Sequence, residues 1–277
     1  MKPIIVLRWV LGALVLAAAA TAQAGRSCEQ HKLTPQTLER GLQLSERIHH
    51  LLEAEHARHA TRVVMLARAG QDLTRYNLRY SHLGFAYRDS SADGAPAWRV
   101  LHKLNQCGSA EGSLYRQGLA EFFLDDLWRQ EAAWSMLAPD LQARLLPLLR
   151  DNTAVARLHH KPYSMVSYPW STRYQQSNQW AIETLALAQP QPAANRAQAQ
   201  AWLFEHGYQP TTLRLGPLTR LGARATAANV AFDDHPSDKR FADRIETATV
   251  DSIFAWLPAS RLGGPPVRAT AQTRVVE

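Results

Sequence analysis

The chain has 277 residues, 46% of them hydrophobic and 20% charged, and its formal net charge is +7. This length and composition allow a hydrophobic core large enough for one large domain or two small ones. The basic residues are mostly arginines mixed with acidic residues, without Lys/Arg blocks interleaved with aromatic residues, which argues against a nucleic-acid partner.

The first residues have the pattern of a secretory signal peptide. Lys2 and Arg8 precede an apolar run over Leu11–Ala20, and small residues follow as far as Ala24. We expect cleavage near Ala24, which removes residues 1–24 and lowers the net charge to about +5. A retained anchor is the alternative, although the run is short for a membrane span. No later stretch is long enough to cross a bilayer, so the sequence predicts an exported, periplasmic protein.

Two cysteines remain after this cleavage, Cys28 and Cys107. In an oxidising compartment an isolated pair most simply forms one disulfide bond. Two free thiols are the alternative. Neither cysteine belongs to a CxxC pair, so the sequence gives no sign of a thioredoxin-like redox function.

The first half of the chain predicts one helix followed by three strands. Thr34 and Pro35 are typical of a helix start, and apolar residues recur at near-helical spacing to about His56. Turn-forming residues between the second and third strands predict an antiparallel hairpin with a long loop. The predicted strands cover residues 62–67, 79–87 and 97–105.

The second half predicts mainly helices. Leu114–Trp134 has apolar residues at helical spacing, and a further helix begins at Pro139 and ends near Arg150. Strands that cluster early, without regular alternation with helices, indicate an α+β fold. We expect one domain over residues 25–260 and a disordered tail over 261–277. The other expected elements are an extended stretch at 161–170, helices at 177–187, 196–206 and 247–257, and short strands within 211–232.

Two histidines on the predicted hairpin are candidates for acid–base chemistry. His82 shares a strand face with Gly84 and Ala86, whose small side chains leave room beside the imidazole. His102 lies on the partner strand, where it could orient the first ring through a hydrogen bond. The alternative for each residue is a packed, hydrogen-bonded core histidine.

Ser177 is the third candidate, because it stands where a polar loop enters an amphipathic helix. The free N–H groups and partial positive charge of a helix N-terminus can stabilise a nucleophile or an oxyanion. The side-chain amides of Gln175 and Gln176 could donate to that oxyanion. The alternative is an ordinary N-cap, in which the serine oxygen accepts hydrogen bonds from the next backbone amides.

Other residues add little chemistry. Asp233, Asp234 and His235 are contiguous, and contiguous residues rarely converge on one metal ion, so we interpret them as a structured loop with a capping role. The chain has no Gly-rich phosphate loop, no GxSxG elbow and no HExxH motif, and we expect no cofactor.

Several segments together resemble an exported bacterial family catalogued as domain of unknown function 2145, which has no established activity. The resemblance spans nearly all of the chain after the leader. Its segments are Gly70–Leu73, Arg79–Ala86, His102–Asn105, Gln175–Trp180, Phe232–Pro236 and Asp251–Trp256.

A second resemblance concerns the order of the candidate residues. A histidine on one strand, a polar residue on the next strand and a nucleophile at a later helix start resemble circularly permuted papain-like hydrolases of the NlpC type. This resemblance implies that His82 is the base, His102 the orienting residue and Ser177 the nucleophile. That superfamily uses cysteine, so a serine here implies either a serine version of the reaction or a scaffold without activity.

Two functions follow as expectations. In the first, the protein binds an envelope ligand such as a peptidoglycan fragment without catalysis, in a cleft near the start of the 177–187 helix. In the second, the chain is a Ser177-dependent amidase or acyl-transfer enzyme acting on peptidoglycan peptides or acyl groups. The residues expected to line the cleft are Trp170, Tyr174, Gln175, Gln176 and Asn178, with Tyr168 beside them.

Overall fold

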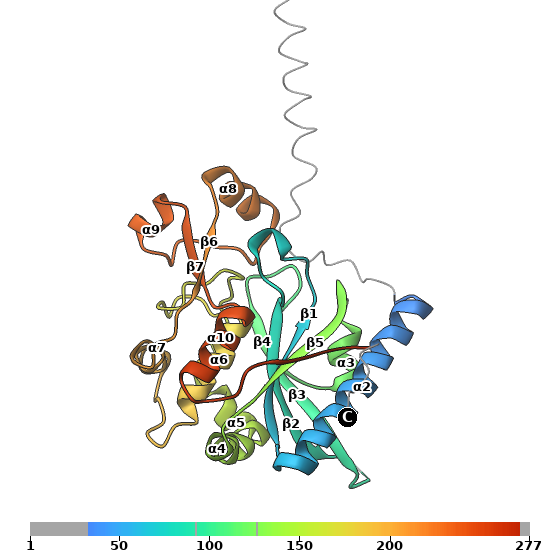
Figure 1. Cartoon of the computed structure of the whole chain (residues 1–277). Helices are drawn as coiled ribbons and strands as arrows, with labels where there is room; N and C mark the ends of the chain where they lie inside the picture. The colour runs from blue at the N-terminus through green and yellow to red at the C-terminus, as the bar shows by residue number, and fades with distance from the viewer. Residues whose placement is uncertain (1–32, 92, 126, 272–277) are drawn as a thin grey trace, which may run out of the picture.

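The computed structural model describes residues 33–91, 93–125 and 127–271. Six antiparallel strands form one sheet, in the order β4-β3-β2-β1-β5-β8, and helices pack on both of its faces (Figure 1). The fold is therefore α+β, as predicted. The strands are β1 Val63–Ala69, β2 His82–Ser90, β3 Pro96–Asn105, β4 Gly112–Gly118, β5 Arg129–Met136 and β8 Val267–Thr270.

The predicted leader and Cys28 lie outside the described residues, so the signal peptide and the Cys28–Cys107 disulfide remain predictions. In the part of the chain that the structure describes, no helix combines the length and the apolar character that a bilayer span requires.

One face of the sheet is covered by α2 (Pro35–His59) and α3 (Leu119–Leu124). Thr34 is the N-cap of α2 and its hydroxyl accepts from the backbone of Thr37, which confirms the predicted helix start. Alternate strand residues point to this face and meet the helices in one core cluster. Its members include Leu44, Ile48, Val64, Leu66, Ala86, Trp98, Val100, Phe122 and Trp134.

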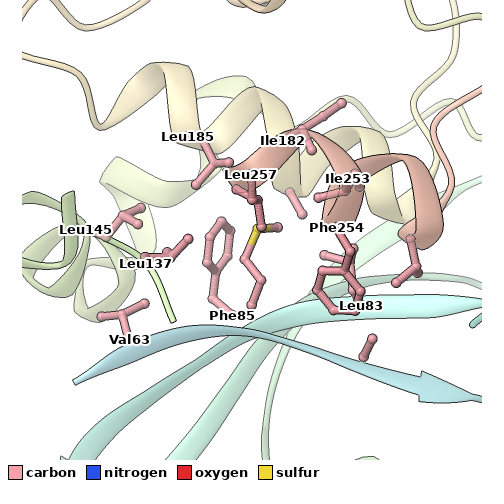
Figure 2. Close-up of a cluster of buried hydrophobic side chains, with 14 of the residues drawn as sticks. Val63, Leu83, Phe85, Leu137, Leu145, Ile182, Leu185, Ile253, Phe254 and Leu257 are labelled. Carbon is pink, nitrogen blue, oxygen red and sulfur yellow. The ribbon is translucent and has the colours of Figure 1, made fainter. Parts of the chain in front are cut away.

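The opposite face is covered by α4, α6 and α10. Leu83 and Phe85 of β2 point from the sheet toward these helices, where they meet residues such as Ile182 and Leu257 (Figure 2). Every residue of α6 is buried, because this helix lies between the sheet and other helices. The covering helices are α4 Pro139–Arg150, α6 Ser177–Leu187 and α10 Val250–Ala259.

The remaining elements lie around this central unit. A two-stranded antiparallel sheet of β6 and β7, together with α8 and α9, forms a small lobe, and the apolar cluster around Ile245 joins it to Leu78. We call this part the β6–β7 lobe (Figure 1). The bounds are α5 Asn152–Val155, α7 Arg196–Glu205, β6 Thr211–Arg214, α8 Pro217–Thr226, α9 Ser237–Phe241 and β7 Arg244–Thr247, with 3-10 turns η2 Thr74–Tyr76 and η3 Ala156–Leu158.

The prediction of a helix over Leu114–Trp134 was wrong. This segment forms β4, the short α3 and β5. Phe122 and Phe123 on α3 and Trp134 on β5 are all buried in the same core cluster. Their spacing in the sequence is also compatible with the apolar face of a single helix, which is why one helix was predicted. The segment 129–136 is a strand because it pairs with β1, and the spacing of apolar residues within the segment gives no information about such a distant partner.

The prediction of a disordered tail over 261–277 was wrong for residues 267–270, which form β8. Val267 and Ala269 alternate along β8, which pairs with β5, and Ala269 is buried. Gly263 lets the chain approach the end of β5, since a Cβ there would lie 2.9 Å from the Met136 carbonyl oxygen. The ordered part of the chain therefore extends beyond the predicted boundary at residue 260.

Candidate functional site

His82 and His102 form a hydrogen-bonded pair across the β2–β3 hairpin. His82 Nε2 lies 2.7 Å from His102 Nδ1, and His102 Nε2 lies 2.8 Å from Gln117 Oε1 on β4. The amide oxygen can only accept, so His102 Nε2–H donates to Gln117. A neutral His102 then accepts from His82 Nε2–H. The predicted orienting contact is present: His82 donates to His102, and His102 donates to Gln117.

The pair is buried against α3 rather than open to a ligand. The ring of His102 is 5.3 Å from that of Phe122, and the ring of His82 is 6.0 Å from it. The Arg68 guanidinium stacks over Phe122 and pairs with Asp125. Burial, together with the positive charge of Arg68, lowers the pKa of His102 to about 3. His102 is therefore neutral at physiological pH.

Ser177 is the first residue of α6, and the N-cap is the preceding residue, Gln176. The side-chain oxygen of Gln176 accepts from the Asn178 backbone N–H, so the predicted N-cap alternative for the serine is also wrong. Ser177 Oγ lies 3.3 Å from the hydroxyl oxygen of Tyr163, which is buried. Burial raises the pKa of Tyr163, so the phenol stays protonated and cannot accept the proton of the serine hydroxyl.

The structure separates Ser177 from the two histidines. Asn178 Oδ1 accepts from the backbone N–H of Leu83, so the start of α6 packs at the start of β2. Leu83, however, points toward α6, and His82, one residue earlier, points to the α3 face. Ser177 Oγ contacts Tyr163, whereas His82 Nε2 contacts His102. The predicted nucleophile–base pair is therefore not assembled, because strand alternation puts the two side chains on opposite faces.

The amides expected to hold an oxyanion are already engaged. Gln175 Nε2 donates to the Leu158 carbonyl and to Glu183, while Gln176 Nε2 donates to Thr247 and Ala248 at 2.9 and 2.6 Å. Both glutamines are buried. Their function is to join the 158–175 loop and the β7–α10 connection to the start of α6.

A polar cluster that the sequence analysis missed lies beneath this loop. Glu183 on α6 is fully buried, and its carboxylate accepts from Arg196 on α7 at 2.8 and 3.0 Å. Gln179 and Gln200 donate to the same carboxylate. We call Glu183, Arg196 and these donors the Glu183 cluster. A glutamate within the apolar run 180–187 was the available signal, since buried acids require partners.

The Glu183 cluster fixes the loop that precedes α6. Arg196 also donates to the backbone carbonyls of Thr172 and Tyr174 at 2.7 and 2.9 Å. Lys103 on β3 reaches the same region and donates to Gln175 Oε1 at 3.0 Å. Burial and the charge of Arg196 lower the pKa of Lys103 to about 7.

The Asp233–Asp234–His235 segment is a structured loop, as predicted, but the helix that follows it, α9, starts after Pro236 without a side-chain cap. Asp234 Oδ2 accepts from the Tyr168 backbone N–H at 2.7 Å, and Asp234 Oδ1 lies 2.9 Å from His235 Nδ1. His235 Nε2 lies 2.9 Å from the Glu246 carbonyl oxygen. Both ring nitrogens thus have protein partners, and among residues 33–271 as described, no three metal-binding side chains gather together.

An open depression lies on the outer side of this fixed loop. It has a volume of about 700 Å³ and runs between the loop and α7. Trp170 is half-buried, its ring centroid 5.6 Å from that of Phe204 at an angle of 86°. The Phe204 side chain is 68% exposed. Ser171, Thr172, Ala197, Gln200, Ala201 and Glu205 complete the lining.

The structure thus divides the predicted binding residues into two groups. Trp170 lines the depression, whereas Gln175, Gln176 and Asn178 are buried and bonded within the protein. Tyr174 is half-buried beside Arg173 and lies outside the lining. The exposed partner, Phe204, was missed because exposure cannot be read from one phenylalanine on a helix.

The model of one protein family, described as an uncharacterised protein conserved in bacteria (DUF2145), matches residues 55–257. The chain therefore belongs to this family, as the sequence resemblance predicted. No curated protein and no solved structure matches the chain.

Proposed function

We propose that this protein is a non-catalytic binding protein of the cell envelope, and that its ligand occupies the depression between Trp170 and Phe204. The observation that carries the proposal is the exposed Phe204 ring set perpendicular to Trp170 beside polar groups. An exposed aromatic pair in a depression favours a ligand with apolar faces and a polar rim.

The lining narrows the chemistry of the ligand. Aromatic rings can cover the apolar face of a sugar ring or an alkyl side chain, while the Ser171 and Thr172 hydroxyls offer hydrogen bonds. The Glu205 carboxylate can accept from hydroxyl, amide or ammonium groups. A peptidoglycan fragment carries all of these groups, and the predicted leader supports an envelope location.

The buried Glu183 cluster supports binding rather than chemistry. It holds the loop with Trp170 through the Thr172 and Tyr174 carbonyls, so the depression is formed before a ligand arrives. A preformed site lowers the entropy lost on binding. By contrast, a serine hydroxyl needs an adjacent base to react, and His82 and His102 lie across the sheet from Ser177.

The proposal includes a permuted papain-like scaffold. The chain order supports it: a strand with His82, a strand with His102, and a later helix, α6, on the same sheet. In this interpretation the protein keeps the papain-like scaffold, but its nucleophile position, Ser177, and its base position, His82, are not placed to react together.

Binding to purified peptidoglycan sacculi and to soluble muropeptides tests the proposal. We expect Phe204→Ala and Trp170→Ala each to weaken binding by about tenfold, as truncation of a central aromatic contact commonly does. Ser177→Ala should bind as the parent does, and none of the proteins should turn the ligand over.

Equal binding by Phe204→Ala and the parent would sink the proposed site, and a parent that binds neither sacculi nor muropeptides would sink the ligand class. Turnover by the parent that disappears in Ser177→Ala would establish the alternative, a Ser177-dependent amidase or acyl-transfer enzyme. Circular dichroism of each variant checks that the fold is retained.

A further inference from the structure

Helix α8 in the β6–β7 lobe presents its apolar side to the solvent. Leu218 and Leu221, three residues apart and thus on one face, are 85% and 68% exposed. Ala223, on the other side, packs on the lobe's apolar cluster. A surface helix normally turns its apolar stripe toward the core. In α8 these two leucines face the solvent instead.

Within the chain segment that contains α8, the charged side chains are all arginines. Residues 206–232 contain three arginines and no acidic residue. Arg224 is exposed on α8, whereas Arg220 is held by an ion pair with Asp243 at 2.6 Å. The apolar stripe is therefore flanked by a guanidinium that is open to an anionic partner.

A second exposed apolar side chain lies in the neighbouring helix. Phe241, at the end of α9, is 75% exposed, and the guanidinium of Arg240 lies over its ring at 5.1 Å. The Arg220–Asp243 pair joins α8 to the turn that follows α9. Both helices lie at the outer end of the β6–β7 lobe (Figure 1). The nearby Asp238 lies 4.0 Å from Arg244, which offsets its charge.

We propose that α8 docks on the surface of an anionic phospholipid bilayer, and that Phe241 extends this contact. Leu218 and Leu221 enter the boundary between headgroups and acyl chains, and Arg224 meets the lipid phosphates. Helices with an apolar face flanked by Arg or Lys bind membranes in this way, without spanning them. The surface is separate from the Trp170–Phe204 depression and does not depend on the function proposed for it.

Cosedimentation with lipid vesicles tests this surface, using protein purified after export and removal of its predicted leader. The parent should bind vesicles that contain phosphatidylglycerol, and it should bind pure phosphatidylcholine vesicles less. The double variant Leu218→Ser/Leu221→Ser should bind about tenfold more weakly or not at all, because its apolar anchor is lost. Arg224→Glu should weaken binding to the anionic vesicles and leave the phosphatidylcholine result unchanged.

Leu42→Ser is the matched control, since Leu42 is an exposed leucine on α2, outside the lobe. It should bind as the parent does. Binding that survives in the double variant, or a parent that ignores anionic vesicles, would overturn the proposal. Light scattering measures the oligomeric state of the parent and of the double variant. If the parent is a dimer, the double variant is a monomer and neither binds vesicles, the surface would be assigned to a second copy of the chain.

Discussion

His102 and Lys103 are neighbours on β3, yet they belong to different polar clusters on opposite faces of the sheet. His102 joins His82 and Gln117 beneath α3, whereas Lys103 reaches the loop fixed by the Glu183 cluster. Both side chains are fully buried, and burial lowers the pKa of each. The two clusters differ in what they hold: one locks strands to each other, and the other shapes the wall of an open depression.

The comparison teaches that a dense set of polar side chains does not by itself mark a reactive site. In both clusters the polar side chains donate to and accept from other groups of the protein, so the cost of their burial is offset by hydrogen bonds. The depression beside Trp170 and Phe204 has fewer polar groups, but two of them, Thr172 and Glu205, are exposed to a ligand. Availability, rather than polarity, distinguishes the candidate binding surface from the buried architecture that supports it.

The largest expected effect comes from breaking the Glu183 cluster. Glu183→Gln leaves the buried Arg196 without its carboxylate, and we expect a loss of about 3–5 kcal/mol in the free energy of unfolding. Urea denaturation measures this loss. Lys161→Ala removes an exposed partner of Glu111 and is the control, with an expected cost of about 0–1 kcal/mol. A similar small cost for Glu183→Gln would show that the cluster does not fix the loop.

Lys103 should make stability rise with pH in the alkaline range. Its folded-state pKa is about 7, below the unfolded value, so the unfolded chain binds more protons between these two values. We expect the free energy of unfolding to increase by about 2 kcal/mol from about pH 7.5 to pH 9.5. Lys103→Met should flatten this slope, and an equal slope in parent and variant would refute the assignment.

His102 should make the free energy of unfolding fall as the pH decreases in the acidic range. Its pKa falls from 6.5 unfolded to about 3 folded, so protonation favours the unfolded chain as the pH drops below about 6.5. From about pH 7.5 to pH 5.5 we expect a loss of about 1 kcal/mol of stability. His102→Gln should lose less over the same range. His159, whose pKa burial lowers to about 4, contributes to the slope in both proteins, and only their difference is diagnostic.

A small effect is also expected for Ser177→Ala. The substitution removes one hydrogen bond with Tyr163 and leaves the Gln176 cap in place, so we expect a loss below about 1–1.5 kcal/mol. Thermal unfolding of the two proteins provides the comparison. A loss of several kcal/mol would mean that this hydroxyl supports more of the α6 start than its contact with Tyr163.

Much of the fold was predictable because local signals agreed with it. Thr34 and Pro35 predicted the start of α2, and the turn-rich loop predicted the β2–β3 hairpin. The segment Leu114–Trp134 was not predictable, since its apolar spacing fits one helix as well as the observed strand–helix–strand path. The pairing of β8 was missed because one short strand gains its stability from β5, which is distant in the sequence.

The sequence by itself determined the candidates: a histidine on each hairpin strand, a serine at a helix start, and an aromatic residue, Trp170, before that helix. Period-two alternation even predicted which residues share the face of His82. Only the tertiary structure decided that His82 and Ser177 lie on opposite faces of the sheet, because a helix position in sequence does not specify the face it covers. The same packing buried Gln175 and left Phe204 open, and thereby located the candidate binding surface.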